Sequence, residues 1–197
     1  MSRRAKRVSV ANCSGTFTNG VQIMTTIRKV KIPEGVKAQL DGMQLRVTGP
    51  KGQISRNVRF PQVTVSCDGN EVIITTESRR KETMAIVGTF AAHTKNMCRG
   101  VSEGFEYRMK VVYAHFPIQL KLQGNRLEIS NFLGEKKARS ARIEAGVTAK
   151  VANDEVVLSG IDRELVGTSA ANIEHATHIR DRDPRVFQDG IYIVQRG

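Results

Sequence analysis

A short loop near the end of the chain carries three closely spaced arginines, Arg180, Arg182 and Arg185. A guanidinium group is planar, permanently charged and able to donate two parallel hydrogen bonds, so it suits phosphate and carboxylate oxygens better than an ammonium group does. Pro184 stiffens the loop and prevents the preceding helical pattern from continuing. The pattern indicates an anion-binding loop; the alternative is a solvated loop whose arginines pair with Asp181 and Asp183.

A second group of cations lies about forty residues earlier, after Gly134, and consists of Lys136, Lys137, Arg139 and Arg142. A charged edge strand that prevents sheet-to-sheet aggregation would have the same composition. Two separate basic groups exceed what edge protection requires. We therefore predict that both groups bind RNA.

Candidate catalytic residues do not form a convergent set in the sequence. His175 and His178 share one helix face and, with Asp181, could form part of a metal-dependent hydrolase site. The sequence has no glycine-rich nucleotide loop and no Gly-x-Ser-x-Gly nucleophile motif. We predict that the protein is not an enzyme and needs neither a metal nor a cofactor, with the hydrolase as the competing hypothesis.

The overall composition favours a polyanionic partner. The 197 residues have a net charge of +12 and a pI near 10.1, which indicates nucleic acid first and an acidic surface second. Few aromatic residues are left for base stacking, so folded, double-helical RNA is favoured over single strands. No apolar run approaches 18 residues. Three widely separated cysteines are typical of a reducing cytosol, not of a disulfide framework or a zinc cluster.

Alternating strands and two helices must position these basic residues. Apolar and polar residues alternate at 36–41 and 43–47, and further strands are expected near 63–65, 72–75 and 105–113. A helix is predicted for 78–99, with Gly100 just past its end. A second helix is predicted to finish shortly before Arg180, and a short apolar strand, 191–194, follows an Asp-Gly turn.

The chain contains an internal duplication with an offset of 79 to 86 residues. Residues 40–47 match 122–129, residues 70–74 match 154–158, and residues 88–93 match 167–172. The expected fold class is α+β, with two duplicated domains that are each an antiparallel β-sheet with one long helix packed on one face. We predict a first repeat at 24–112, with a net charge of +7, and a second repeat at 113–197, with a net charge of +1.

The first 23 residues are predicted to form a basic, flexible N-terminal extension. They hold four Lys and Arg and no acidic residue, and they lack the apolar segment of a secretory signal. A basic arm that orders on RNA, a targeting peptide and an extension upstream of a usual start at Met24 are all compatible with this stretch.

The tail of the chain resembles that of a known family. It is similar to the tail of archaeal and eukaryotic members of the large-ribosomal-subunit protein six family, number nine in the eukaryotic count, at His175, Ile179, Arg182, Arg185, Phe187, Asp189 to Ile193 and Arg196. Ile32–Pro33, residues 47–52 and residues 163–167 resemble the family too, so the similarity spans about Met24 to Arg196. The chain departs from the family in having His175 where Gln is usual, and in residues 1–23, which precede the family's usual start.

This resemblance implies a structural constituent of the large subunit, in the cytoplasmic ribosome, that has no catalysis of its own. It implies binding to 23S-type ribosomal RNA near the sarcin-ricin loop and the factor-binding region beside the stalk base. Neighbouring large-subunit proteins and translational GTPases would lie close by, and no membrane would be involved. The second repeat would be the main RNA-binding domain, which agrees with its basic residues, Lys136, Lys137, Arg139, Arg142, Arg180, Arg182 and Arg185.

Overall fold

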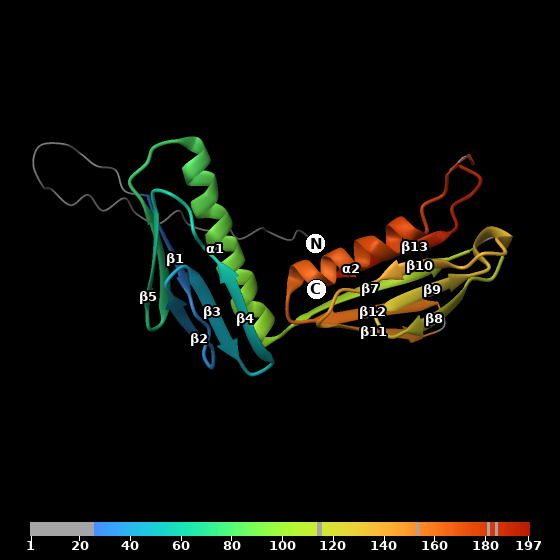
Figure 1. The fold of residues 1–197 in the computed structure, drawn as a ribbon, viewed down its shortest axis with the longest axis horizontal. Helices are drawn as coiled ribbons and strands as arrows, with labels where there is room; N and C mark the ends of the chain where they lie inside the picture. Colours follow the sequence, from blue (N-terminus) through green and yellow to red (C-terminus); the bar gives the residue numbers. More distant parts are fainter. Residues whose placement is uncertain (1–25, 114–115, 153, 181, 184) are drawn as a thin grey trace, which may run out of the picture.

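The computed structural model describes residues 26–113, 116–152, 154–180, 182–183 and 185–197. The predicted N-terminal extension, residues 1–23, lies outside this set. Figure 1 shows two bodies arranged along the long axis, each with one long helix laid against strands. The predicted α+β class, with a duplicated sheet-and-helix unit, is confirmed.

Over its described residues the first body contains six strands and one helix: β1 (Thr26–Lys31), β2 (Lys37–Asp41), β3 (Gln44–Gly49), β4 (Gly52–Asn57), β5 (Val63–Asp68), β6 (Glu71–Thr76) and α1 (Lys81–Ser102). Two antiparallel sheets, β1-β6-β5 and β2-β3-β4, both pack against α1. Alternating side chains such as Leu45 and Val47 are fully buried beneath the helix, because successive strand residues point to opposite faces.

The second body repeats this arrangement and, in the part of it that the structure describes, has seven strands, a short 3-10 turn and one helix: β7 (Phe105–Val112), β8 (Gln119–Gln123), β9 (Arg126–Ser130), η1 (Phe132–Gly134), β10 (Arg139–Arg142), β11 (Val147–Ala152), β12 (Glu155–Gly160), α2 (Arg163–Ala176) and β13 (Gly190–Arg196). Its sheets are β11-β12-β7-β13 and β10-β9-β8. One apolar core runs beneath α2 and includes Met109, Leu127, Leu158 and Ile173.

Strand β7 belongs to the β11-β12-β7-β13 sheet of the second body, although the sequence places it at the end of the first repeat. It pairs antiparallel with β12 and with β13, so the expectation that residues 105–113 complete the first sheet is wrong. The pairing of β7 with β12 corresponds to the pairing of β1 with β6. Each repeat therefore begins with its own first strand, and β13 is an additional strand. We propose a domain division between α1 and β7, in place of one near Tyr113.

Helix α1 runs three residues further than the sequence predicts. Gly100 was expected to follow its end but lies inside it. A Cβ at this position would overlap the carbonyl oxygen of Ile161, in the turn that leads into α2. Gly100 is thus needed for close approach between the two bodies, not as a helix cap. Ile161 itself packs against the core of the first body.

Candidate nucleic-acid interface

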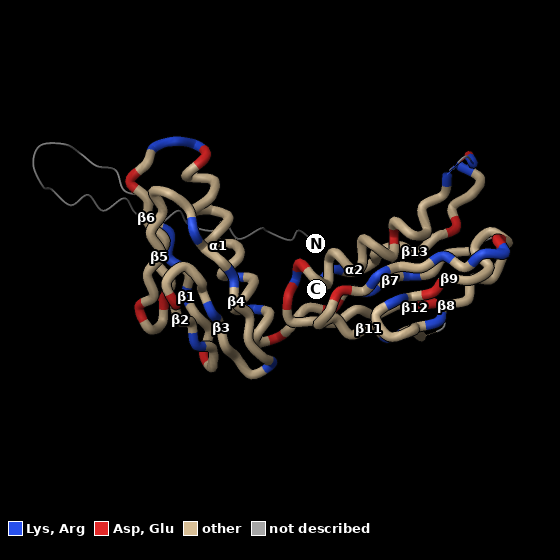
Figure 2. Tube along the Cα trace, viewed as in Figure 1, with Lys and Arg blue, Asp and Glu red and all other residues tan. Residues whose placement is uncertain are grey.

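Five exposed cations lie on two loops at the end of the second body that is away from the first. We call them the distal basic cluster: Lys136, Lys137, Arg180, Arg182 and Arg185. They come from two loops, one between η1 and β10 and one between α2 and β13. Figure 1 shows both loops at this end of the molecule, and Figure 2 shows segments of Lys and Arg in each of them. Hydrogen bonds from Arg139 to Ala176 and His178 place the two loops beside each other, although their basic residues are 43 to 49 positions apart in the sequence.

Arg139 links the two loops, and its guanidinium is already engaged in hydrogen bonds within the protein. Its guanidinium donates to the carbonyl oxygens of Ala176, at 3.1 Å, and His178, at 3.0 Å. The Ala176 oxygen is one of those that the end of α2 leaves without a helical partner. The guanidinium also donates two hydrogen bonds to Glu135, at 2.5 and 2.9 Å, and lies 4.3 Å from the centre of the Phe132 ring. The structure therefore gives Arg139 a positioning role.

The pKa of Glu135 indicates that the two loops are close to each other. The hydrogen bond from Arg139 lowers the pKa of Glu135 below its ordinary value, and the charges of Arg139 and Arg182 act in the same direction. Arg182, which belongs to the second loop, is thus close enough to influence a carboxylate of the first.

Arg142 lies outside the distal basic cluster. It is three residues further along β10, about 10 Å at the usual strand rise, and faces Arg126 across the strand pair. Its Nε is 3.6 Å from a carboxylate oxygen of Glu144. Of the seven cations predicted to bind RNA, five lie on these two loops, Arg139 links the loops, and Arg142 lies further along β10.

The loop after α2 has a defined shape over its described residues. The Asp183 carboxylate accepts from the main-chain N–H of Arg185 at 2.9 Å, and the Arg182 guanidinium lies 4.8 Å from the centre of the Phe187 ring. Phe187 in turn packs against the core of the second body. This arrangement anchors the loop while Arg180, Arg182 and Arg185 remain exposed.

Replacing Arg139 by glutamine should lower the free energy of unfolding by about 1–3 kcal/mol. The variant leaves the Ala176 and His178 carbonyl oxygens without these donors and removes both hydrogen bonds to Glu135. Urea unfolding followed by circular dichroism measures the change. Lys137→Gln is the matched control, since Lys137 is exposed, and it should change stability by less than about 0.5 kcal/mol. Equal stabilities for the two variants would contradict the positioning role of Arg139.

The residues of the competing hydrolase hypothesis do not assemble into a metal site in the described part of the chain. His175 and His178 are both exposed near the end of α2, and Asp181 lies outside the described residues. Among the residues that the structure does describe, no three His, Cys, Asp or Glu side chains are grouped so that they could hold a metal ion. Neither described helix combines the length and hydropathy needed to cross a membrane.

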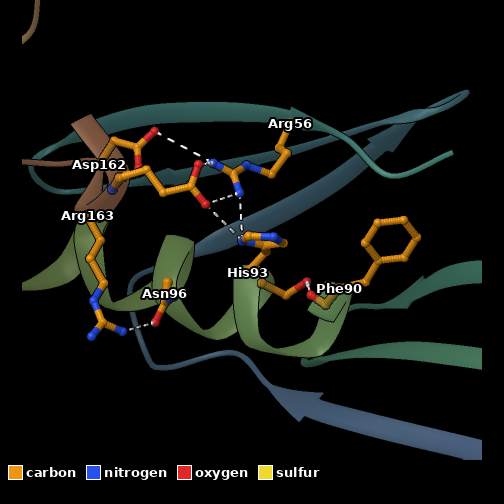
Figure 3. Close-up of polar contacts among 8 residues, drawn as sticks. Arg56, Phe90, His93, Asn96, Asp162 and Arg163 are labelled. Atoms are coloured by element: carbon orange, nitrogen blue, oxygen red, sulfur yellow. Dashed lines mark hydrogen bonds and ion pairs between the residues drawn. The ribbon is translucent and has the colours of Figure 1, made fainter. Parts of the chain in front are cut away.

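A second polar cluster, which sequence reasoning missed, lies between the two bodies (Figure 3). Arg56, on β4, donates to both carboxylate oxygens of Glu164, in the first turn of α2, at 2.7 and 2.5 Å. His93, on α1, places its Nδ1 3.2 Å from Glu164 and 2.6 Å from Arg56. The Asp162 carboxylate caps α2 by accepting from the Glu164 N–H at 2.9 Å. The sequence offers no signal for this meeting, because His93 is isolated in it.

These side chains fasten the two bodies together and leave no room for a substrate. The hollow that they and their neighbours line measures only about 10 Å³, close to the volume that one water molecule requires. Arg163 adds a longer contact of 3.4 Å to Asn96. We therefore interpret the acid, base and imidazole groups as a clamp between the bodies and not as an active site.

The ion pair between Arg56 and Glu164 predicts that the stability of the protein falls at acid pH. The hydrogen bonds from Arg56 lower the pKa of Glu164, so its contribution to stability is present above the unfolded-state pKa, about 4.5, and is lost as pH falls through the lower folded-state pKa. Glu164→Gln should reduce stability at pH 7, by about 1 kcal/mol because the carboxylate is half exposed, and should flatten the decline below pH 4.5. Unfolding by urea across this pH range checks the prediction, with Arg56→Gln expected to behave in the same way. Parallel pH profiles for the wild type and both variants would refute it.

Comparison with known proteins agrees with the duplicated architecture. The family model described as Ribosomal protein L6 matches residues 32–104 and again residues 116–190. The protein named large ribosomal subunit protein uL6 of Methanospirillum hungatei is 57% identical over 173 residues, 88% of this chain and 98% of that relative. Its namesakes in Methanocella arvoryzae and Methanosarcina mazei are 54% and 52% identical over 86% of this chain, and over 97% and 96% of their own lengths. On this evidence the chain belongs to the ribosomal protein L6 family.

Proposed function

We propose that this chain binds folded large-subunit ribosomal RNA through the distal basic cluster, near the sarcin-ricin loop and the factor-binding region beside the stalk base. As a member of its family it is a protein of the large ribosomal subunit and works in translation as part of a ribonucleoprotein. The proposal adds the site, the RNA region and a supporting role for the surface on which translational GTPases dock. It assigns no catalysis to the chain itself.

One observation carries the assignment of the site. The second repeat, counted from β7, is nearly neutral, with 14 Lys and Arg against 12 Asp and Glu in residues 105–197, yet five of its cations lie exposed on two loops at one end. Cations on loops that are held by Arg139 and Phe187 suit the phosphates of a folded RNA, because such contacts depend on backbone shape and not on base sequence.

Chemical footprinting of large subunits tests the proposed location. Subunits assembled with the full-length chain should show protection of RNA backbone positions near the sarcin-ricin loop, compared with subunits assembled without it. The chain should also sediment with large subunits. Protection confined to another RNA region would refute the location, and failure to sediment with large subunits would refute the proposal as a whole.

A further inference from the structure

A hollow of about 370 Å³ lies beside the distal basic cluster, between the end of α2, the loop that follows and β13. Its walls include Glu174, His175, His178, Phe187, Gln188 and Tyr192. This volume is within the range of about 300–1,000 Å³ that is typical of ligand pockets. The proposed phosphate contacts of the cluster make no use of it.

Hydrogen bonds and close packing hold the walls of this hollow in place. The Thr177 hydroxyl oxygen accepts from the Ile191 N–H at 3.2 Å, which ties the end of α2 to the start of β13. The Tyr192 hydroxyl donates to the Gln188 carbonyl oxygen at 3.2 Å. The ring of Tyr192 lies so close to Gly190 that a Cβ there would be 3.0 Å from it. The hollow is therefore preformed.

The wall chemistry fits a nucleobase better than it fits a phosphate. The Glu174 carboxylate would repel a phosphate, whereas it can accept hydrogen bonds from the exocyclic amino group of a base. The Tyr192 side chain, 43% exposed, and the two exposed histidines offer ring faces of the kind on which unstacked RNA bases settle. The Gln188 side chain can both donate and accept.

The neighbouring arginines would hold the backbone on either side of such a base. Arg180 leads out of the wall residue Ile179, and Arg182 lies 4.8 Å from the ring centre of the wall residue Phe187. We infer that the hollow receives one unstacked base of the bound RNA, a base with an exocyclic amino group, with its ring against Tyr192 and its edge toward Glu174. This inference rests on the proposed function and adds a base contact to it.

Ultraviolet crosslinking of large subunits that contain the full-length chain tests the inference, because it joins bases to side chains in direct contact. Trypsin cleaves after arginine, so residues 186–196 carry Tyr192 and Phe187, and residues 164–180 carry both histidines. After digestion with ribonuclease and trypsin, mass spectrometry should find an adenine, guanine or cytosine nucleotide on one of these two peptides.

Two tyrosine variants sharpen this test. Tyr192→Leu should lower the yield of the adduct by about tenfold, because a base–aromatic stack is lost, while Tyr192→Phe should retain it. Tyr113→Leu is the matched control, since Tyr113 is 44% exposed but lies outside the hollow, and it should leave the yield unchanged.

The outcomes separate this inference from the proposed function. Subunits that retain the chain but give no adduct on either peptide would overturn the base contact and leave RNA binding intact. A uridine adduct alone would overturn the amino-edge assignment, and a crosslink to another protein would identify a protein occupant instead. Failure of the chain to bind ribosomal RNA at all would overturn the proposed function itself.

Discussion

Replacing Arg180, Arg182 and Arg185 together by glutamine should weaken binding of the full-length chain to large-subunit ribosomal RNA by roughly 100-fold. The three side chains are exposed on a loop that Phe187 anchors to the core, and each charge-assisted contact with a phosphate is worth about 1 kcal/mol after allowance for solvent. The loss should be similar for RNA variants with altered base sequence, since phosphate contacts carry no sequence information.

The salt dependence of binding provides a second readout of the same variant. Each phosphate contact releases close to one counterion, so the slope of log K against log salt should become shallower by about 2 to 3 units. Filter binding across a series of salt concentrations measures both quantities. Circular dichroism confirms that the variant is folded, because Arg182 also contacts the Phe187 ring.

A control with the same loss of charge distinguishes the site from bulk electrostatics. Lys121, Arg126 and Lys150 are exposed cations of the second body that lie on β8, β9 and β11, outside the two loops of the cluster. Their replacement by glutamine also removes three positive charges, and it should weaken RNA binding several-fold less than the replacement of Arg180, Arg182 and Arg185 does. Equal losses for the two triple variants would show that net charge decides binding and would refute the assignment of the site.

Gly100→Ala should destabilise the protein by about 1–3 kcal/mol, although alanine is the better helix former. In an isolated helix this change would stabilise by roughly 0.5–1 kcal/mol. Here the new methyl group meets the main-chain oxygen of Ile161, an obstacle that cannot rotate away, and overpacking of this kind costs about 1–3 kcal/mol. Unfolding by urea measures the stability, and small-angle X-ray scattering reports whether the two bodies have moved apart.

Gly88→Ala in the same helix is the matched control for this prediction. A Cβ at Gly88 meets nothing within 4 Å, so the substitution should stabilise the protein by about 0.5–1 kcal/mol. The two variants should therefore change stability in opposite directions. A stabilising effect of Gly100→Ala, with unchanged scattering, would show that α1 does not need this close approach.

Local patterns in the sequence were sufficient for most of the individual elements. The alternation that predicted a strand around Leu45 is matched by β3, because a half-buried strand must alternate whatever its neighbours are. The strands expected near Val65 and Ile74 are matched by β5 and β6. The duplication and the tail motif identified the fold class and the family, both of which are confirmed.

Pairing partners could not be predicted in the same way. The alternation of β7 would be the same in a sheet of the first body and in a sheet of the second. Its sequence therefore does not reveal that it lies between β12 and β13. The same limit applies to Gly100, whose local context is equally compatible with a helix end. Only the packing of Ile161 against α1 explains why a glycine stands there.

The sequence alone determined which cations this protein carries, on which elements, and to which family it belongs. Tertiary structure decided which of those cations lie together, that Arg139 holds the two loops in place, and that Arg56, His93 and Glu164 meet across the two bodies. The physical reason is range: alternation, helix periodicity and turn residues act over a few positions, whereas these contacts join residues from 37 to 108 positions apart.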